Sequence, residues 1–280
     1  MEQKKNPALF QVDAFTDRPF GGNPAAVCLC REFPSEETMR SIAMEMNLSE
    51  TAFVVPENPC EHRETTAFSI RWFTPVVEVP LCGHATLASS LVLFDEIGVP
   101  GKTISFSSKS GPLRASREPE GVLLDFPMNR PVETEAPGEV LSAMGIERFD
   151  DVRLAREALM LLVRLPGEQA LVDLEPDFGA MLKAERGADY EGVIVTAASS
   201  TWDFVSRYFG PWEGLNEDPV TGSAHTVLAP YWNDVTGKRS FRAFQASARG
   251  GELLVRLAPG DRVEIVGQGR IVLKGELFTI

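Results

Sequence analysis

The chain has 280 residues, of which 44% are hydrophobic and 24% are charged, and its formal net charge is −13 at pH 7. This length allows one large domain or two ordinary ones, and the composition is typical of a soluble globular protein. Nucleic acids are polyanions that bind to basic faces, so the acidic balance argues against a nucleic-acid partner. A membrane partner is not expected either, because the longest uncharged stretch, residues 79–94, is too short to cross a bilayer.

The N-terminal residues and the cysteines indicate the compartment. Residues 1–5 lack the apolar core of a signal peptide. The four cysteines include no CxxC pair of the metal-binding type, and their spacing is not that of a secreted protein. A reducing cytoplasm is therefore the expected location.

Local patterns predict several elements along the chain. Ser35 precedes two glutamates and a run that extends to Met46, which predicts an amphipathic helix beginning at Ser35. Residues 68–73 and 103–106 alternate in the manner of strands. Residues 85–94 are apolar or small on every side, so we expect a helix surrounded by protein. Residues 224–232 have the same character, although Pro230 is expected to kink or end that second helix.

Comparison of the chain with itself reveals a repeat. Residues 49–55, 83–85 and 106–127 are followed, about half a chain length later and in the same order, by similar segments at 190–196, 222–224 and 244–267. The repeat predicts two homologous α+β domains, residues 1–130 and residues 131–280, each with a helix wrapped by its own sheet. The junction is expected near Pro127 to Pro137, and a C-terminal strand near 270–280 is able to return to the first domain.

Both predicted buried helices begin with a glycine, Gly83 in the first and Gly222 in the second. A ligand can approach a glycine closely, and the unpaired amides and dipole of a helix N-terminus favour an anion. If the two halves are related by a pseudo-twofold axis, the two helix starts face one another and together bind a carboxylate. The alternative is that both glycines serve only a tight helix entry. Ser223 adds a hydroxyl to the anion site or is simply a helix N-terminal residue.

Glu50 is the candidate acid/base because it precedes the apolar strand 52–55 and is expected to lie at the rim of a core. Partial burial there predicts a raised pKa, while its counterpart Glu191 is expected to be solvated. His84, in the helix-entry motif, is predicted to donate a hydrogen bond or relay a proton, or else to cap the helix. Asp218 begins an Asp-Pro turn before the second helix and is a further candidate.

Metal, thiol and cofactor chemistry are not expected. His62, His84 and His225 are scattered and supply no familiar set of metal ligands. Every cysteine lies at or before position 82, so a racemase with one thiol from each half is excluded, and Cys82 is interpreted as a small buried residue. The sequence carries no phosphate loop, dinucleotide fingerprint or Schiff-base lysine context. Cofactor-free proton transfer is what remains.

These residues resemble those of the phenazine-biosynthesis PhzF-like proteins, which share the diaminopimelate epimerase-like fold. The matching segments run almost the full length of the chain. They are residues 12–17 (VDAFTD), 21–24 (GGNP), 47–53 (NLSETAF), 71–75 (RWFTP) with Glu78, 81–88 (LCGHATLA), 217–225 (EDPVTGSAH) with 230–232 (PYW), and 245–251 (QASARGG).

The resemblance implies two domains of one topology, each a curled sheet around a central helix, with the active site between them. It implies that Glu50 shuttles a proton between carbons of a small carboxylate-bearing substrate, with His84 and Asp218 as further catalytic residues. The same resemblance implies substrate binding by Asn23, Gly83, Gly222 and Ser223, and a homodimer. Members that make phenazines tend to carry a Gly-Arg-Pro-Ser segment where this chain has residues 245–251, so the chain resembles a broader branch of the family.

The leading hypothesis is thus a cofactor-independent isomerase with Glu50 as its general acid/base in an interdomain cleft. Two alternatives stay open. An amino-acid racemase or epimerase with two non-thiol bases would use Asp218 or His84 as its second base. A non-catalytic binding protein of the same fold would keep the carboxylate site without turnover.

Overall fold

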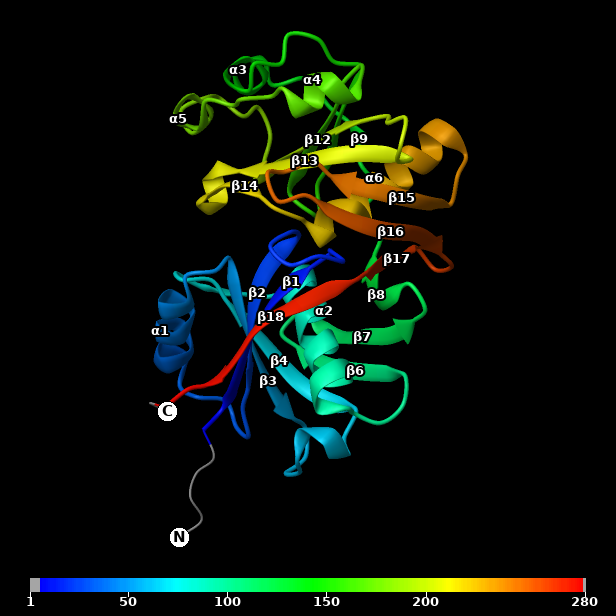
Figure 1. The fold of residues 1–280 in the computed structure, drawn as a ribbon. Coiled ribbons are helices and arrows are strands. Elements are labelled where there is room, and N and C mark those ends of the chain that lie inside the picture. Colours follow the sequence, from blue (N-terminus) through cyan, green and yellow to red (C-terminus); the bar gives the residue numbers. More distant parts are fainter. Residues whose placement is uncertain (1–5, 279–280) are drawn as a thin grey trace. The chain divides into compact units, whose positions relative to one another are not determined.

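A computed structural model describes residues 6–278, and the chain divides into two compact units. Unit 1 comprises the chain up to Asp125 together with the part from Val266 onward, and unit 2 comprises Phe126–Ile265. Figure 1 shows the course of the chain through the strands and helices of each unit. In the described part of the chain, the longest apolar helices fall short of what a membrane crossing requires.

Unit 1 is built on a mixed sheet. β1 pairs antiparallel with both β2 and β18, β2 pairs parallel with β3, and β3 pairs antiparallel with β4. β4 continues antiparallel to β5 and parallel to β6, and β6, β7 and β8 follow as an antiparallel series. The bounds are β1 Ala8–Ala14, β2 Asn23–Leu29, β3 Glu50–Pro56, β4 Ala67–Phe73, β5 Glu78–Val79, β6 Thr103–Ser108, β7 Gly111–Glu118, β8 Gly121–Pro127 and β18 Gly269–Glu276.

The helices of unit 1 follow the predicted patterns. α1 (Glu36–Met46) begins after Ser35, whose side chain accepts a hydrogen bond from the Thr38 amide at 3.1 Å, as predicted. A 3₁₀ turn, η1, covers His62–Glu64. α2 (Gly83–Leu91) packs against β1, β2, β3 and β18, so its uncharged sequence is surrounded by protein, as predicted. It continues as a π-helical segment, η2 (Val92–Ile97).

Unit 2 repeats this topology. β11 and β12 are parallel, β12–β13 and β13–β14 are antiparallel, β13 and β15 are parallel, and β15–β16 are antiparallel. Its strands are β9 Val132–Glu133, β10 Asp151–Ala155, β11 Met160–Arg164, β12 Gly192–Ala197, β13 Phe204–Gly210, β14 Leu215–Asp218, β15 Ser240–Gln245, β16 Gly251–Ala258 and β17 Arg262–Gly267. Its helical elements are α3 Gly138–Ala143, α4 Glu168–Val172, α5 Phe178–Met181, η3 Pro211–Glu213 and α6 Gly222–Thr236.

The order of pairings in unit 2 is that of unit 1, with β2 to β6 corresponding to β11 to β15 and α2 corresponding to α6. The segments matched in the sequence lie on corresponding elements, since residues 49–55 and 190–196 lead into β3 and β12. An α+β architecture with a repeated, curled sheet around a central helix is therefore confirmed.

Of the two alternatives predicted for Pro230, a kink or a helix end, the second is wrong, because α6 continues to Thr236. A proline lacks the N–H that would bond to the carbonyl four residues earlier. In this structure the carbonyl of Thr226 accepts instead from the backbone N–H of Asn129 at 3.2 Å, and the Asn129 side chain donates to the Thr226 hydroxyl at 2.8 Å. The Asn129 N–H, from a distant segment of unit 2, thus replaces the N–H that Pro230 lacks, and α6 continues beyond the proline.

Candidate active site

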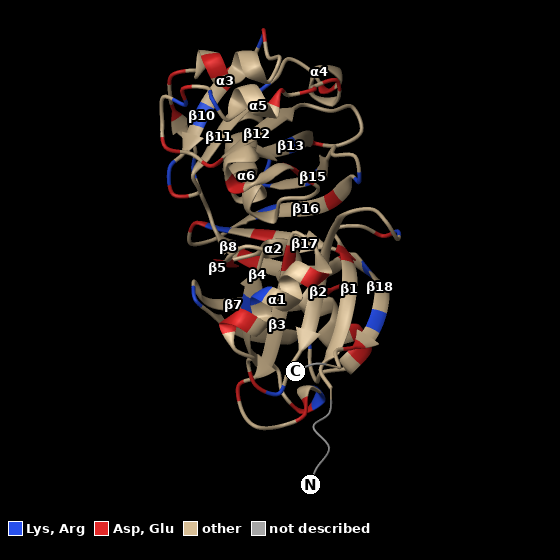
Figure 2. Ribbon diagram, turned by 90° about the vertical axis from the view of Figure 1, so that its left-hand side faces the viewer, with Lys and Arg blue, Asp and Glu red and all other residues tan. Residues whose placement is uncertain are grey.

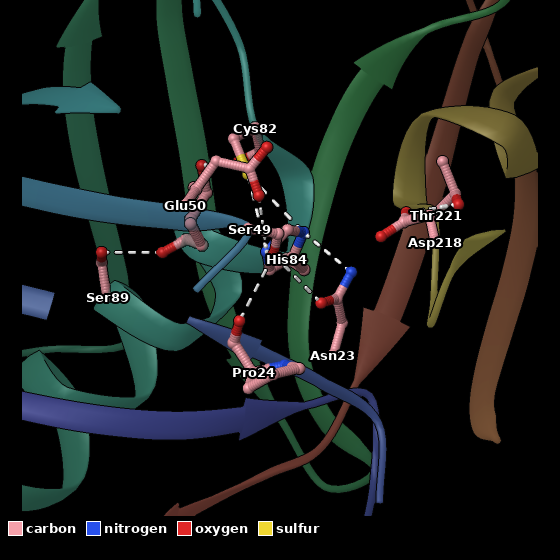
Figure 3. A network of polar contacts seen from close by, with 11 residues as sticks. Asn23, Pro24, Ser49, Glu50, Cys82, His84, Ser89, Asp218 and Thr221 are labelled. Atoms are coloured by element: carbon pink, nitrogen blue, oxygen red, sulfur yellow. Dashed lines mark hydrogen bonds and ion pairs between the residues drawn. The ribbon is translucent and has the colours of Figure 1, made fainter. Parts of the chain in front are cut away.

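The candidate site of unit 1 forms where three elements begin. β2 and β3 are parallel neighbours that start at Asn23 and Glu50, so these two residues lie at the same end of the two strands. The helix α2 packs on both strands and starts at Gly83, after Cys82 in an extended conformation. Figure 3 shows the side chains of Asn23, Glu50, Cys82 and His84 converging there.

His84 is the centre of the contacts. Its Nε2 lies 3.1 Å from Oε2 of Glu50 and 3.3 Å from the hydroxyl of Ser49. Its Nδ1 lies 3.3 Å from the Asn23 amide nitrogen and 3.6 Å from the Cys82 sulfur. The Glu50–His84 distance is that of an ion pair, yet Oε2 of Glu50 has no aligned hydrogen-bond donor among the described residues. The contact between Glu50 and His84 is therefore an ion pair without a well-aligned hydrogen bond.

Charge controls the ionisation of the pair. Burial is the largest influence and would raise the pKa of Glu50, but the charge of His84 and the polar contacts of His84, Ser49 and Cys82 together outweigh it and hold that pKa below its ordinary value. Burial would likewise lower the pKa of His84, while the neighbouring sulfur of Cys82 and the carboxylate of Glu50 raise it well above its ordinary value. The prediction of a raised Glu50 pKa is thus wrong for this structure, and Glu50 is an ionised carboxylate beside a protonated imidazole.

The charge of His84 fixes the orientation of the Asn23 amide. An imidazolium donates from both ring nitrogens, so its Nδ1 requires an acceptor. In the structure the amide nitrogen of Asn23 lies 3.3 Å from Nδ1, so a protonated His84 requires that the amide be turned with its oxygen towards Nδ1. In the turned amide the nitrogen would face the Ser49 hydroxyl, which in the structure donates to the amide oxygen at 3.4 Å.

In unit 2 a second polar cluster surrounds the start of α6. Asp218 ends β14 and accepts a hydrogen bond from the Thr221 hydroxyl at 2.5 Å. Gln245, fully buried, accepts from the Thr221 amide at 2.8 Å and donates to the Asp218 carbonyl at 2.8 Å. Because Thr221 turns its hydroxyl to Asp218, it does not cap α6, and Cys82 does not cap α2. Both helices therefore present their first amides without a side-chain cap.

The predicted site residues fall into these two clusters. Glu50, His84 and Asn23 lie together in unit 1, next to Gly83 at the start of α2. Asn23, predicted to bind substrate, has no exposed surface and contacts His84 and Ser49. In unit 2, Asp218 is buried near Gly222, and Ser223 is exposed on the first turn of α6. Glu191 is exposed, as expected for the counterpart of Glu50.

Four polar residues of the two clusters were not found from the sequence, namely Ser49, Cys82, Thr221 and Gln245. Cys82 is buried, as predicted, but its sulfur also contacts His84. A signal for it was available, because the internal repeat aligns Cys82 with Thr221, and each immediately precedes the first glycine of a central helix.

A family model described as "Phenazine biosynthesis-like protein" matches residues 12–275. The chain belongs to the phenazine biosynthesis-like family. A relative from Pseudomonas aeruginosa, named an uncharacterized isomerase, is 48% identical over 95% of this chain and 97% of its own. A crystal structure of a PhzF family protein from Enterococcus faecalis is 40% identical, covers 98% of this chain and 99% of its own, and superposes with a TM-score of 0.89.

The fold extends beyond this family. A probable proline racemase from Agrobacterium radiobacter K84 covers 98% of this chain and 93% of its own with a TM-score of 0.63, at 12% sequence identity. At that identity the likeness concerns the fold alone. The phenazine biosynthesis-like family thus shares an epimerase-like topology of two repeated sheets, each around a helix, which agrees with the fold predicted from the sequence.

Proposed function

We propose that this protein is an isomerase that moves a proton within a small carboxylate-bearing substrate, with Glu50 as its general acid/base. The observation that carries the proposal is the largely buried carboxylate of Glu50, held in its ionised form 3.1 Å from His84 at the open start of α2. An ionised carboxylate is the form that can accept a proton from carbon. The relative named as an isomerase supports the reaction class.

In the proposed reaction, Glu50 removes a proton from a carbon that is acidified by conjugation. The electron pair of the broken C–H bond enters the conjugated system, the double bond shifts, and the protonated Glu50 returns its proton to another carbon. His84 stabilises the carboxylate of Glu50 in the resting state and is freed as a donor when Glu50 takes up the proton. Because Glu50 and His84 lie side by side, both act on the same face of the substrate, which favours transfer over inversion.

The substrate carboxylate is proposed to bind backbone amides. The first turn of α2, headed by Gly83, has uncapped N–H groups and the positive end of a helix dipole beside Glu50. Gly222 and Ser223 give the start of α6 the same capacity, and we propose a supporting role in proton relay for Asp218, held by Thr221. Asn23 acts on substrate through His84, since it contacts that ring and has no exposed surface.

The test is incorporation of deuterium from D₂O into a panel of small unsaturated carboxylates. Replacing the base, Glu50→Gln, is expected to lower the exchange rate by about 10²- to 10⁴-fold, the usual contribution of a general base. Glu191→Gln is the matched control, because Glu191 is the exposed counterpart on the repeated unit. A folded Glu50→Gln protein that exchanges at the wild-type rate would refute the assignment. A product with inverted configuration at one carbon would favour an epimerase instead.

A further inference from the structure

The residues around His84 have a second chemical capacity, which is to bind a metal ion. One ligand atom each from Glu50, Cys82 and His84 lie within 4.8 Å of one another. A thiol, an imidazole and a carboxylate form the mixed ligand set that suits Zn²⁺ and other borderline divalent cations. The set arises from Cys82 and Glu50 rather than from the other histidines, which is why histidine spacing did not reveal it.

The nitrogen–oxygen separation of the three-ligand set is close to that around a single tetrahedral ion, and the sulfur lies farther away. With Zn–S near 2.3 Å and Zn–N and Zn–O near 2.0–2.2 Å, the sulfur and nitrogen ligands lie about 3.5 Å apart and nitrogen and oxygen about 3.4 Å apart. Here the Cys82 sulfur is 4.0 Å from Nε2 of His84, and Nε2 is 3.1 Å from Oε2 of Glu50. The sulfur lies nearer Nδ1 than Nε2, so binding of one ion through Nε2 requires that the Cys82 side chain turn about its Cα–Cβ bond and bring the sulfur to the Nε2 side of the ring.

Two further features favour a cation here. The oxygen of Glu50 that faces His84 is buried and lacks a hydrogen-bond donor, so a positive ion would satisfy it. His84 keeps its other ring nitrogen, Nδ1, for Asn23, and an outer partner of this kind orients a metal-bound histidine. The net charge of −13 also draws cations towards the protein, and acidic segments are distributed over both units (Figure 2).

We propose that Glu50, Cys82 and His84 form a three-ligand site for a borderline divalent cation such as Zn²⁺, and that the bound ion switches off proton transfer by occupying Glu50. On binding, the Cys82 S–H bond breaks and a metal–sulfur bond forms, while Nε2 of His84 exchanges its proton for the metal. Both protons go to the buffer, and no electron is transferred. The inhibition rests on the proposed function of Glu50, whereas the binding itself does not.

The experiment is titration of the full-length chain, under reducing conditions, with Cd²⁺, which takes the same ligands and gives an ultraviolet charge-transfer band with thiolate sulfur. We expect the band to appear with one Cd²⁺ per chain and to be reversed by Zn²⁺. Cys82→Ser should abolish the band and weaken binding by more than about 100-fold, because outer partners alone contribute 10- to 100-fold. Glu50→Gln should weaken binding while it keeps the band.

Cys60→Ser is the matched control, since Cys60 lies outside the cluster and is partly exposed. It should bind Cd²⁺ as the wild type does. Cys28 and Cys30, whose sulfurs are 3.5 Å apart, are the competing source of a thiolate band. A band and affinity unchanged in Cys82→Ser would assign the metal to that pair and overturn the proposal. Binding without loss of deuterium exchange would overturn the inhibition, and absence of binding beside Glu50-dependent exchange would leave the proposed function intact.

Discussion

Lowering the pH is expected to destabilise unit 2 through one buried histidine. His225, on α6, has no exposed surface and lies against the ring of Phe204, with ring centroids 6.0 Å apart. Its Nδ1 donates to the carbonyl of Thr221 at 2.9 Å, so Nε2 is the nitrogen without a proton. Nε2 has no hydrogen-bond partner among the described residues, and a proton added there would be buried without an acceptor.

The magnitude follows from the pKa. Burial, opposed in part by the Thr221 carbonyl, lowers the pKa of His225 from 6.5 to about 4. The unfolded chain therefore takes up this proton first as the pH falls, and the stabilising contribution is present above pH 6.5 and lost by about pH 4. At about 1.4 kcal/mol per pH unit, the whole contribution is about 3 kcal/mol, and about 2 kcal/mol of it is lost on going from pH 7 to pH 5.

The assay compares the wild type with His225→Asn, whose side-chain nitrogen can take the place of Nδ1 but does not titrate. Denaturant unfolding at the two pH values gives the change in the free energy of unfolding for each protein. Hydrogen exchange of the α6 amides reports on unit 2 separately from unit 1. The wild type should lose about 2 kcal/mol more than the variant. Equal losses in the two proteins would show that His225 is not the group responsible.

Three further comparisons between variants test the hydrogen bonding and packing of the two units. Thr196→Val removes the hydroxyl that accepts the Trp232 indole N–H at 3.0 Å and should lower the free energy of unfolding by about 1–3 kcal/mol. Thr51→Val is the control, because the Thr51 hydroxyl is equally buried but has no hydrogen-bond partner among the described residues, so its removal should be neutral or stabilising. Asn129→Pro deletes the N–H that bonds to the Thr226 carbonyl and should speed hydrogen exchange in α6, and adding Pro230→Ala should restore part of the protection. Gly22→Ala should destabilise unit 1 by on the order of 2–4 kcal/mol, because the added Cβ would lie 2.0 Å from the Ala14 carbonyl oxygen. Gly101→Ala, also at positive φ but with open space around the Cβ, should cost only about 1–2 kcal/mol. Equal shifts of the melting temperature for the two variants would contradict the steric argument.

The sequence was sufficient for the repeated fold and for the residues at the two helix starts. Short apolar strands and uncharged helices recur in one order, and that order is a property of the chain that requires no coordinates. Glu50 and His84 could be singled out separately, from a strand start and a helix entry. Their charge pair could not, because it depends on β2 and β3 being parallel and on α2 packing across both.

The errors have the same origin. Burial predicts a raised pKa for Glu50, but the direction is reversed by several groups together, foremost an imidazole from another element 3.1 Å away. Pro230 was judged by the hydrogen bond that it lacks, whereas the compensating donor is Asn129, far away in the chain. Cys82 and His84 are two residues apart, and only the change from extended backbone at Cys82 to helix at Gly83 brings the sulfur beside the ring.

The pairing of β18 with β1 makes unit 1 discontinuous, because its last strand follows the whole of unit 2 in the chain. During synthesis, all of unit 2 therefore emerges from the ribosome before unit 1 can be completed. Until residues 269–276 arrive, β1 presents one unpaired edge, which can pair with another chain. The β1–β18 pairing that covers this edge joins distant parts of the chain and is therefore slow to form. The addition of β18, which completes unit 1, is thus also the step before which a nascent or truncated chain is most exposed to aggregation.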